Sequence, residues 1–324
     1  MPRLLPLNPT ATPTRNITLA LTATLTLALS VAVLSPAGAS AAPVQKPGAQ
    51  PSPTLSHVFV IVLENHSLKD TLDNVNMPAI NRLAHTYGYA ANYTGVAHPS
   101  LPNYVAMIAG STINFTSDDP APRFAGDNLA LQLSRAGLSW RGYMQALPEP
   151  GSLAPYAGTY GKKHNPFMLS SDLLADPAQV MNVRTLADLG PDLDAGRAPS
   201  FSFIVPDVCN DMHGAPECPS GARLDRTGDD FVDTWTKRIM ASPSWKAGAA
   251  IVVTFDEGND RQGGGGRVAT VVVTQGGPRG VVSTAAYNHY SLLRTLEQGF
   301  GLPLLRGAKT ASPMADLFWK AGKK

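Results

Sequence analysis

Cysteine is scarce in this chain, and several other features are absent from it. The 324 residues include only two cysteines, Cys209 and Cys218. Two thiols alone make a poor zinc site, so metal binding by this pair is the weaker alternative to a disulfide. No internal repeat or heptad pattern is present. Beyond residue 41 no apolar run is a second candidate for crossing a bilayer.

The chain also lacks an excess of charge of either sign. The formal net charge is +2, and residues 1–41 hold two arginines and no acidic residue. The remainder therefore carries equal numbers of basic and acidic residues. This balance argues against nucleic acid as a partner and against strong general attraction to anionic bilayers. A phosphorylated small molecule is not excluded, because it needs only a local site.

The first 41 residues have the pattern of a signal peptide. An apolar run covers residues 17–34, Pro36 interrupts the following segment, and Ala-Ser-Ala at 39–41 is a small-residue cleavage site. The alternative is an uncleaved anchor, since the run is long enough to span a membrane. We predict a secreted protein with a disordered linker at 42–54, which is rich in proline and polar residues.

Secretion also determines the state expected for the cysteines. In an oxidising compartment, Cys209 and Cys218 are close enough in sequence to form a disulfide that closes a short loop. That loop contains Asp211 and His213. The bridge would stiffen a segment with potential ligands.

Alternating patterns over residues 55–324 predict one α/β domain, with a mostly parallel central sheet and helices on both faces. We expect strands at 57–63, 201–205, 249–255 and 268–273. We expect helices at 77–88, 102–110, 127–136, 183–189, 228–241 and 287–299. The loop-rich stretches 111–126 and 144–182 are predicted insertions over the site end of the sheet.

Two apolar strands end in pairs of oxygen ligands. Asp256 and Glu257 follow the strand at 249–255 and precede a glycine-rich loop, and Glu64 and Asn65 follow the strand at 57–63. Ligands of open α/β sheets gather at the carboxyl ends of strands, and carboxylate and amide oxygens suit hard cations. We predict a shared divalent metal site. The alternative for either pair alone is a helix N-cap.

Ser100 is the candidate nucleophile. It lies where a helix is expected to begin, beside Pro102 in the first turn, and helix amides there stabilise an anion. A serine oxygen can attack phosphorus when a metal ion lowers its pKa. The alternative is that Ser100 only caps the helix.

Three further polar clusters could contribute to the same site. Lys163 and His164 could bind phosphoryl oxygens, although Lys-Lys-His runs are usually solvated surface. Asp211 and His213 follow the strand at 201–205. His289 opens the last long helix and either faces the site or caps that helix.

Taken in order, these motifs resemble the bacterial phosphoesterase family, which holds secreted acid phosphatases and non-specific phospholipases C and belongs to the alkaline-phosphatase-like superfamily. The resemblance runs from about Ser56 to Trp319. It rests on Leu-Glu64-Asn65-His-Ser, His98-Pro-Ser100-x-Pro-Asn103-Tyr, Lys163-His164-x-Pro, Pro206-x-x-x-Asn210-Asp211-Met-His213, Thr-Phe-Asp256-Glu257 and His289-Tyr-x-x-Leu-x-Thr-Leu-Glu297.

The resemblance implies a role for each matching residue. The metal ligands are Glu64, Asn65, Asp256 and Glu257, together with the oxygen of the nucleophile, Ser100. The polar residues around the phosphoryl group are Asn103, His164 and His213. Lys163, Asp211 and His289 lie within family motifs and are assigned to the substrate.

The resemblance therefore implies a metal-dependent phosphoesterase with an alkaline-phosphatase-like fold. We expect a phosphate monoesterase that acts through a phosphoserine, with His213 as the proton donor to the leaving group. The short acid phosphatase type of the family, including its mycobacterial form, makes phosphatidylinositol 3-phosphate a candidate substrate. The alternatives are a phosphodiesterase of the phospholipase C type and a non-catalytic secreted module with structural metal ligands. The chain departs from the family pattern at one place: Glu257 is followed by Gly258, Asn259 and Asp260, where relatives often carry more acidic residues.

Overall fold

The computed structural model describes residues 54–320. The predicted signal peptide, and the predicted linker up to residue 53, lie outside the described residues. A central sheet of nine strands runs through the described part of the chain, with order β10-β2-β9-β8-β1-β7-β3-β6 and with β11 paired to β2. Its strands are β1 (Val58–Leu63), β2 (Gly88–Thr94), β3 (Trp140–Met144), β6 (Val183–Thr185), β7 (Phe201–Val205), β8 (Ala250–Phe255), β9 (Arg267–Thr274), β10 (Val281–Ser283) and β11 (Tyr287–Asn288).

The sheet is mostly parallel, as predicted. β1 pairs in parallel with both β7 and β8, and β3 pairs in parallel with β6 and β7. β9 is the exception, because it runs antiparallel to β8 and to β2. All six residues of β1 and of β8 are buried, which explains their continuous apolar sequences.

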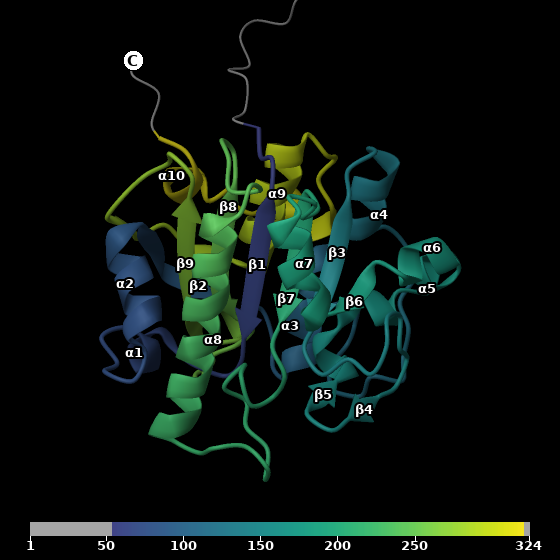
Figure 1. Ribbon diagram of the computed structural model, residues 1–324, viewed down its shortest axis with the longest axis horizontal. Helices are drawn as coiled ribbons and strands as arrows, with labels where there is room; N and C mark the ends of the chain where they lie inside the picture. Colours follow the sequence, from purple (N-terminus) through teal and green to yellow (C-terminus); the bar gives the residue numbers. More distant parts are fainter. Residues whose placement is uncertain (1–53, 321–324) are drawn as a thin grey trace, which may run out of the picture. The chain divides into compact units, whose positions relative to one another are not determined.

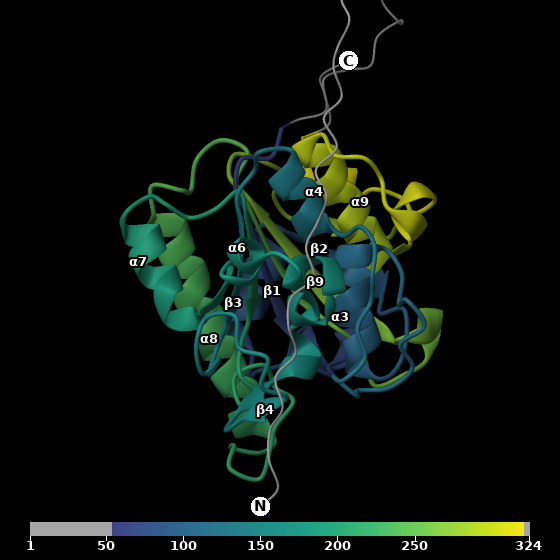
Figure 2. The same ribbon diagram turned by 90° about the vertical axis from the view of Figure 1, so that its right-hand side faces the viewer.

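Helices cover both faces of the sheet, as Figures 1 and 2 show. One face carries α2 (Pro78–Thr86), α7 (Leu189–Asp194) and α8 (Ala222–Ala241). The other carries α3 (Ser100–Ala109), α4 (Leu129–Arg135) and α9 (His289–Phe300). Every residue of α3 is buried, and the helix ends at Gly110, whose φ of 68° is the left-handed conformation common after helices. α9 begins at a capping box between Asn288 and Ser291.

The insertion at 144–182 folds into several short elements. They are the hairpin β4 (Tyr156–Ala157) and β5 (Tyr160–Gly161), the 3₁₀ helices η1 (Lys162–His164) and η2 (Pro166–Leu169), and the single turns α5 (Ser171–Leu174) and α6 (Pro177–Val180). The remaining short elements are α1 (Leu68–Thr71), η3 (Leu186–Asp188), η4 (Gln262–Gly264), η5 (Arg306–Lys309) and α10 (Ala315–Phe318).

The predicted helix at 183–189 is wrong. Residues Val183–Thr185 form β6, which pairs with β3, and a helix begins only at Leu186. Pairing with a neighbouring strand decides the conformation of a three-residue segment whose own sequence preference is weak. The other predicted helices and strands are present, with ends shifted by a few residues; α8 begins six residues earlier than expected. Within residues 54–320 no helix is long and apolar enough to cross a membrane.

Candidate active site

The parallel pairing of β1 with β8 brings the two oxygen-ligand pairs to one edge. Leu63 lies opposite Phe255, so Glu64 and Asp256 leave neighbouring strands side by side. The Asp256 amide donates to the Leu63 carbonyl at 3.0 Å, which extends the pairing by one residue. The chain then turns at Asn65, whose φ of 57° is a conformation that asparagine tolerates better than most residues.

Glu64, Asp256 and Glu257 are all buried, with at most 6% of any of them exposed. Burial raises the pKa of Asp256 well above its usual range, and the charges of Glu64 and Glu257 raise it further. Burial also raises the pKa of Glu257 to about 7, although His98 opposes the shift.

Asp256 Oδ2 has no hydrogen-bond partner within residues 54–320. The outer oxygens of the other two carboxyls face only histidine nitrogens: Glu64 Oε1 lies 3.2 Å from His164 Nε2, and Glu257 Oε2 lies 2.6 Å from His98 Nδ1. Buried like charges with unpaired oxygens are costly unless a cation balances them. Asn65 adds an amide to the same cluster: its backbone N–H donates to Asp256 Oδ1 at 3.1 Å, and its Nδ2 donates to Glu64 Oε2 at 3.2 Å. These residues fit a divalent metal ion.

Ser100 lies against this carboxylate cluster. Its hydroxyl donates to Glu64 Oε2 at 2.8 Å, and Glu257 Oε1 lies 3.5 Å away. Ser100 is the first residue of α3, and the N-cap is Pro99, which follows a cis peptide bond. The reading of Ser100 as a helix cap is therefore wrong, because its hydroxyl is directed to a carboxylate from another strand.

Asn103 stabilises the loop that precedes Ser100. Its Oδ1 accepts from the amides of Val96 and Ala97, and its Nδ2 donates to the carbonyls of Ala97 and Pro99 at 2.9 and 3.2 Å. Contact between Asn103 and a substrate, as predicted from the sequence, would require one of these bonds to break.

Glycines allow this loop to approach the segment after Glu257. A Cβ on Gly265 would lie 2.6 Å from the Gly95 carbonyl carbon and 2.6 Å from the Ala97 oxygen. The glycine-rich sequence after Glu257 is thus a packing requirement of the site.

His164, in η1, is buried between two acidic residues. Its Nε2 lies 3.2 Å from Glu64 Oε1 and its Nδ1 lies 3.4 Å from Asp211 Oδ2. The ring stacks on Tyr104, with 5.1 Å between the ring centroids. Burial lowers the pKa of His164 to about 4, so the imidazole is neutral near pH 7.

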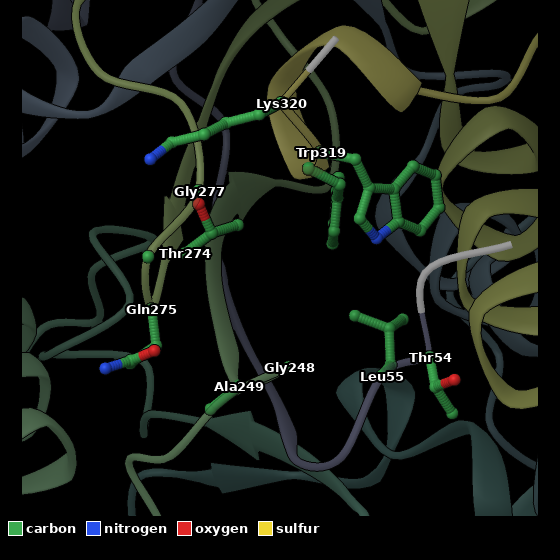
Figure 3. A pocket seen from close by; sticks show the side chains of 11 residues that line it. Thr54, Leu55, Gly248, Ala249, Thr274, Gln275, Gly277, Trp319 and Lys320 are labelled. Atoms are coloured by element: carbon green, nitrogen blue, oxygen red, sulfur yellow. The ribbon is translucent and has the colours of Figure 1, made fainter. Parts of the chain in front are cut away.

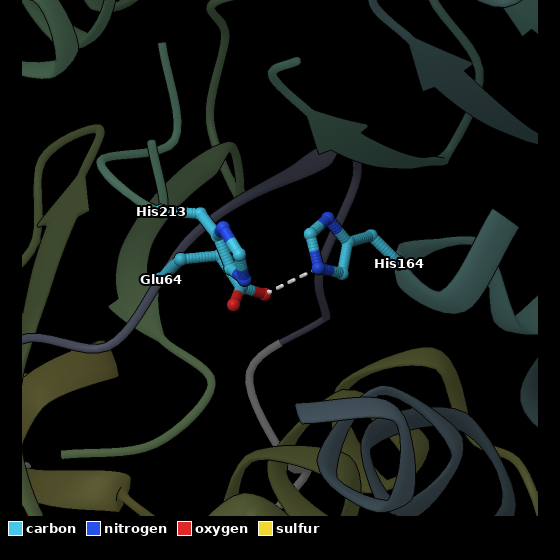
Figure 4. A group of neighbouring side chains, drawn as sticks. All are labelled: Glu64, His164 and His213. Atoms are coloured by element: carbon cyan, nitrogen blue, oxygen red, sulfur yellow. Dashed lines mark ion pairs between the residues drawn. The ribbon is translucent and has the colours of Figure 1, made fainter. Parts of the chain in front are cut away.

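Figure 4 shows His213 beside Glu64, with His164 facing Glu64 from the other side. Potential ligand atoms of these three residues lie within 4.8 Å of one another, so Glu64 belongs to both the carboxylate cluster and a histidine cluster. His213 is exposed and lies at the mouth of the site. Its Nδ1 lies 2.8 Å from the Gly214 carbonyl, and its Nε2 lies 3.1 Å from Lys163 Nζ. Because a carbonyl only accepts, we assign the proton of the neutral ring to Nδ1.

The predicted disulfide between Cys209 and Cys218 is present, with 5.1 Å between the Cα atoms. Inside the loop, Asp211 is fully buried. Its carbonyl accepts from the Glu64 amide at 2.7 Å, and its Oδ1 accepts from the His213 amide at 2.7 Å. Burial raises the pKa of Asp211 to about 8. Asp211 thus connects the disulfide loop to the end of β1.

His289 is at the site edge but has no free ring nitrogen. Its Nε2 lies 2.6 Å from the Asp256 carbonyl and its Nδ1 lies 3.0 Å from the Tyr93 hydroxyl. Burial lowers the pKa of His289 to about 4. Asn288 caps α9, and so the alternative in which His289 serves as the cap is wrong. A contact between His289 and substrate stays a prediction.

The structure adds two residues that the sequence analysis did not select. His98 Nδ1 lies 2.6 Å from Glu257 Oε2, and its Nε2 donates to the Asp260 carbonyl at 2.8 Å. Asp118 lies 2.8 Å from Lys163 Nζ. His98 could have been found from its place in the His-Pro-Ser motif. Asp118 lies in a loop without a recognisable pattern.

A cavity of about 280 Å³ lies at the opposite end of β8, beside Ala249, Thr274 and Trp319 (Figure 3). Among the residues that the structure describes, no carboxylate or histidine lines this cavity, and it is separated from Asp256 by the length of the strand. The chemically active groups are therefore concentrated at the carboxyl edge.

The sequence model of the Phosphoesterase family matches residues 69–303. The chain belongs to the phosphoesterase family. It is a phosphoric ester hydrolase, and the curated relatives it matches are phosphatases.

Two relatives illustrate the range of similarity. A phosphatidylinositol-3-phosphatase from Mycobacterium tuberculosis is 32% identical over 271 residues, which cover 82% of this chain and 84% of that protein. A probable acid phosphatase from Kluyveromyces lactis is 27% identical and is covered over 58% of its length by 76% of this chain. The chain thus spans little more than half of the fungal relative.

Solved structures confirm the predicted fold. An alkaline phosphatase superfamily protein from Vibrio parahaemolyticus superposes with a TM-score of 0.54, covering 81% of this chain and 71% of that one at 10% identity. A lipoteichoic acid synthase from Listeria monocytogenes gives 0.55, with 82% and 76% covered at 8% identity. At this level of identity the likeness concerns the fold alone.

Proposed function

We propose that this phosphoesterase is a secreted, metal-dependent acid phosphatase that hydrolyses phosphate monoesters through a phosphoserine at Ser100. The observation that carries the proposal is the hydrogen bond from the buried Ser100 hydroxyl to Glu64, within a cluster of three buried carboxyls of which Asp256 Oδ2 has no partner in the described structure. The names of the relatives, acid phosphatases and a phosphatidylinositol-3-phosphatase, support the reaction class.

The residues that would hold a divalent metal ion are Glu64, Asn65, Asp256, Glu257 and the Ser100 oxygen. Such an ion supplies positive charge that favours ionisation of a serine hydroxyl and stabilises phosphoryl oxygens. Glu64 accepts the hydrogen of the Ser100 hydroxyl and so directs Oγ into the site. Glu64 also lies beside the two histidines (Figure 4), which can contribute further ligands.

As Ser100 Oγ forms its bond to phosphorus, its proton passes to Glu64 Oε2 and the bond to the leaving oxygen breaks. Water later cleaves the phosphoserine, which restores the serine hydroxyl and releases inorganic phosphate. Lys163 contributes an ammonium group close to His213 for the phosphoryl oxygens. His213 holds its own proton at Nδ1, against Gly214. A proton taken up at Nε2 can therefore pass to the leaving oxygen.

Secretion is proposed from the apolar leader and is supported by the disulfide, which persists in oxidising compartments. In this arrangement residues 1–41 are the signal peptide, 42–54 a linker and 55–324 the catalytic domain. Phosphatidylinositol 3-phosphate is a candidate substrate because the Mycobacterium tuberculosis relative carries that name.

The test is turnover of p-nitrophenyl phosphate by the purified protein, with and without a chelator, beside Ser100→Ala. We expect activity that the chelator abolishes and added divalent metal restores. Ser100→Ala should lose at least about 1,000-fold in kcat while its circular dichroism is unchanged, because the attacking atom is gone.

Ser111→Ala is the matched control, since Ser111 lies just beyond the far end of α3 and only accepts a bond from Ile113. Its turnover should equal that of wild type. If Ser100→Ala keeps more than about a tenth of kcat, Ser100 is not the nucleophile. A protein that binds metal without any turnover would instead be a binding module.

A further inference from the structure

Asp118 lies at the junction of two segments that carry proposed catalytic residues. It belongs to the insertion 111–126 and is only partly exposed. Its Oδ2 lies 2.8 Å from Lys163 Nζ, and its Oδ1 accepts from the Leu101 amide at 3.0 Å. Lys163 is in η1 and Leu101 follows Ser100 in α3. One carboxylate therefore joins the segment of the proposed nucleophile to the segment of the proposed phosphate-binding lysine.

The hydrogen bond from the Leu101 amide gives α3 an acceptor for one of its N-terminal amides. The N-cap of this helix is Pro99, which has no side-chain acceptor, so the first amides of the helix lack a cap from their own segment. Asp118 supplies the acceptor from 17 residues away, and a negative charge at a helix N-terminus is favourable. Because the Leu101 amide is taken by Asp118, it is not available to a phosphate in this structure. The cap also fixes the turn that presents Ser100.

The bond to Lys163 determines where its ammonium lies. The Lys163 side chain is only 11% exposed, and Asp118 is the one carboxylate within 4.0 Å of Nζ among residues 54–320. The same Nζ lies 3.1 Å from His213 Nε2. Asp118 thus positions Lys163 beside the proposed proton donor.

We propose that Asp118 is a positioning residue for the phosphatase reaction. It fixes Lys163 and the first turn of α3 relative to one another and does not contact the substrate. An exposed ion pair usually contributes little to stability, but here each oxygen of one carboxylate holds a different functional segment. The inference rests on the proposed function, because it assigns Lys163 to the phosphoryl group.

The two roles of Asp118 can be separated by substitution. Asp118→Asn keeps an oxygen that can accept from Leu101 but removes the charge that holds Lys163. Asp118→Ala removes both. We expect Asp118→Asn to lower kcat/KM for p-nitrophenyl phosphate about tenfold, and Asp118→Ala to lower it further. Asp119→Asn is the control, since Asp119 is exposed and its side chain accepts from Ala121 only; its kcat/KM should equal that of wild type.

A double-mutant cycle with Lys163→Gln distinguishes positioning from a general structural defect. If Asp118 acts through Lys163, adding Asp118→Asn to Lys163→Gln should cost less than about twofold. The additional loss in Asp118→Ala should persist in the Lys163→Gln background, because it comes through Leu101. An equal factor in both backgrounds, or no loss in Asp118→Asn, overturns the inference while wild-type turnover and the Lys163→Gln loss remain intact. If the wild type has no turnover, the proposed function fails and the role of Asp118 fails with it.

Discussion

Glu64 uses its two carboxyl oxygens for different neighbours. Oε2 accepts from Ser100 and Asn65, whereas Oε1 faces His164 at 3.2 Å without a hydrogen bond. Glu64 thus contacts both the proposed nucleophile and His164. Replacing this side chain should therefore disturb both metal binding and the orientation of Ser100.

The first prediction concerns the proposed metal ligands. Glu64→Gln and Asp256→Asn each remove one negative charge from the carboxylate cluster with little change of shape. Both should lower the bound metal per protein and lower kcat at least about 100-fold, since charged oxygens are the preferred ligands of hard cations. Elemental analysis of the pure proteins and turnover of p-nitrophenyl phosphate measure the two effects.

Glu217→Gln is the control for this experiment, because Glu217 is an exposed carboxylate in the disulfide loop. Its metal content and kcat should match those of wild type. Unchanged metal content in both site variants would show that these carboxylates do not share an ion.

The second prediction uses Glu297, a buried residue of α9 outside the site. Its Oε1 accepts from the Leu305 amide at 2.9 Å, and its Oε2 has no partner within the described residues. Burial raises its pKa from 4.5 to about 8. Between pH 4.5 and pH 8 the Glu297 carboxyl is protonated in the folded state and ionised in the unfolded state. This group therefore lowers the free energy of unfolding as the pH rises from about 4.5 to 8, by on the order of a few kcal/mol.

Glu297→Gln cannot release that proton, so its melting temperature should fall less than that of wild type between pH 5 and pH 8. A difference of several degrees is expected, at roughly 2–4 °C per kcal/mol. Glu149→Gln, at an exposed position, should keep the wild-type dependence. Parallel curves for Glu297→Gln and wild type would contradict a raised pKa. Calorimetric or fluorescence melting over this pH range is the measurement.

The residues of the site differ in how readily they can be predicted from the sequence. Glu64 and Asp256 could be predicted because each directly follows an apolar strand, and parallel strands end at one edge. Asp118 could not be predicted. It contacts Lys163 and Leu101 only because of the path of a loop that has no periodic pattern.

At the scale of elements, burial explains what the sequence could and could not predict. β8 and β9 are both apolar over their lengths, so both were recognisable as strands. An apolar run contains no information about direction, and the antiparallel course of β9 was not predicted. The strands β2 and β3 were missed, because glycine and polar residues interrupt their apolar patterns.

The third prediction concerns the loop closed by Cys209 and Cys218. Replacing both cysteines by serine should lower the free energy of unfolding by about 2–3 kcal/mol, since the unfolded chain regains the freedom of a short loop. It should also lower kcat, because the loop places Asp211 beside Glu64 and His213 beside Lys163. Denaturant unfolding and p-nitrophenyl phosphate turnover measure the two effects.

Oxidised and reduced wild type provide the matched comparison. Mild reduction of the wild type should reproduce both losses, whereas the serine variant should not respond to the reductant. A serine variant with wild-type stability and kcat would mean that the loop is held by its hydrogen bonds alone.

At the scale of the whole molecule, the site is assembled from segments far apart in sequence. Ser100 meets Glu64 across 36 residues, and Asp256 meets Asn65 across 191. The sheet order brings these residues together, since β8 pairs with β1 although β2, β3, β6 and β7 lie between them in sequence. Sequence patterns therefore predicted which residues are chemically suited to the site, and the topology determines which of them touch.

The final prediction concerns substrate class, which depends on the combined charge of the site. A phosphate monoester carries one more anionic oxygen than a diester. Lys163 is held charged beside His213 at the mouth, so it can bind that oxygen more strongly in the transition state. We expect kcat/KM for p-nitrophenyl phosphate to exceed that for bis-p-nitrophenyl phosphate at least about tenfold, or about 1.4 kcal/mol. In Lys163→Gln this preference should shrink.

With vesicles, inorganic phosphate should be released from phosphatidylinositol 3-phosphate and no diacylglycerol from phosphatidylcholine. A preference for the diester, or release of diacylglycerol, would instead assign the protein to the phospholipase C branch of the family.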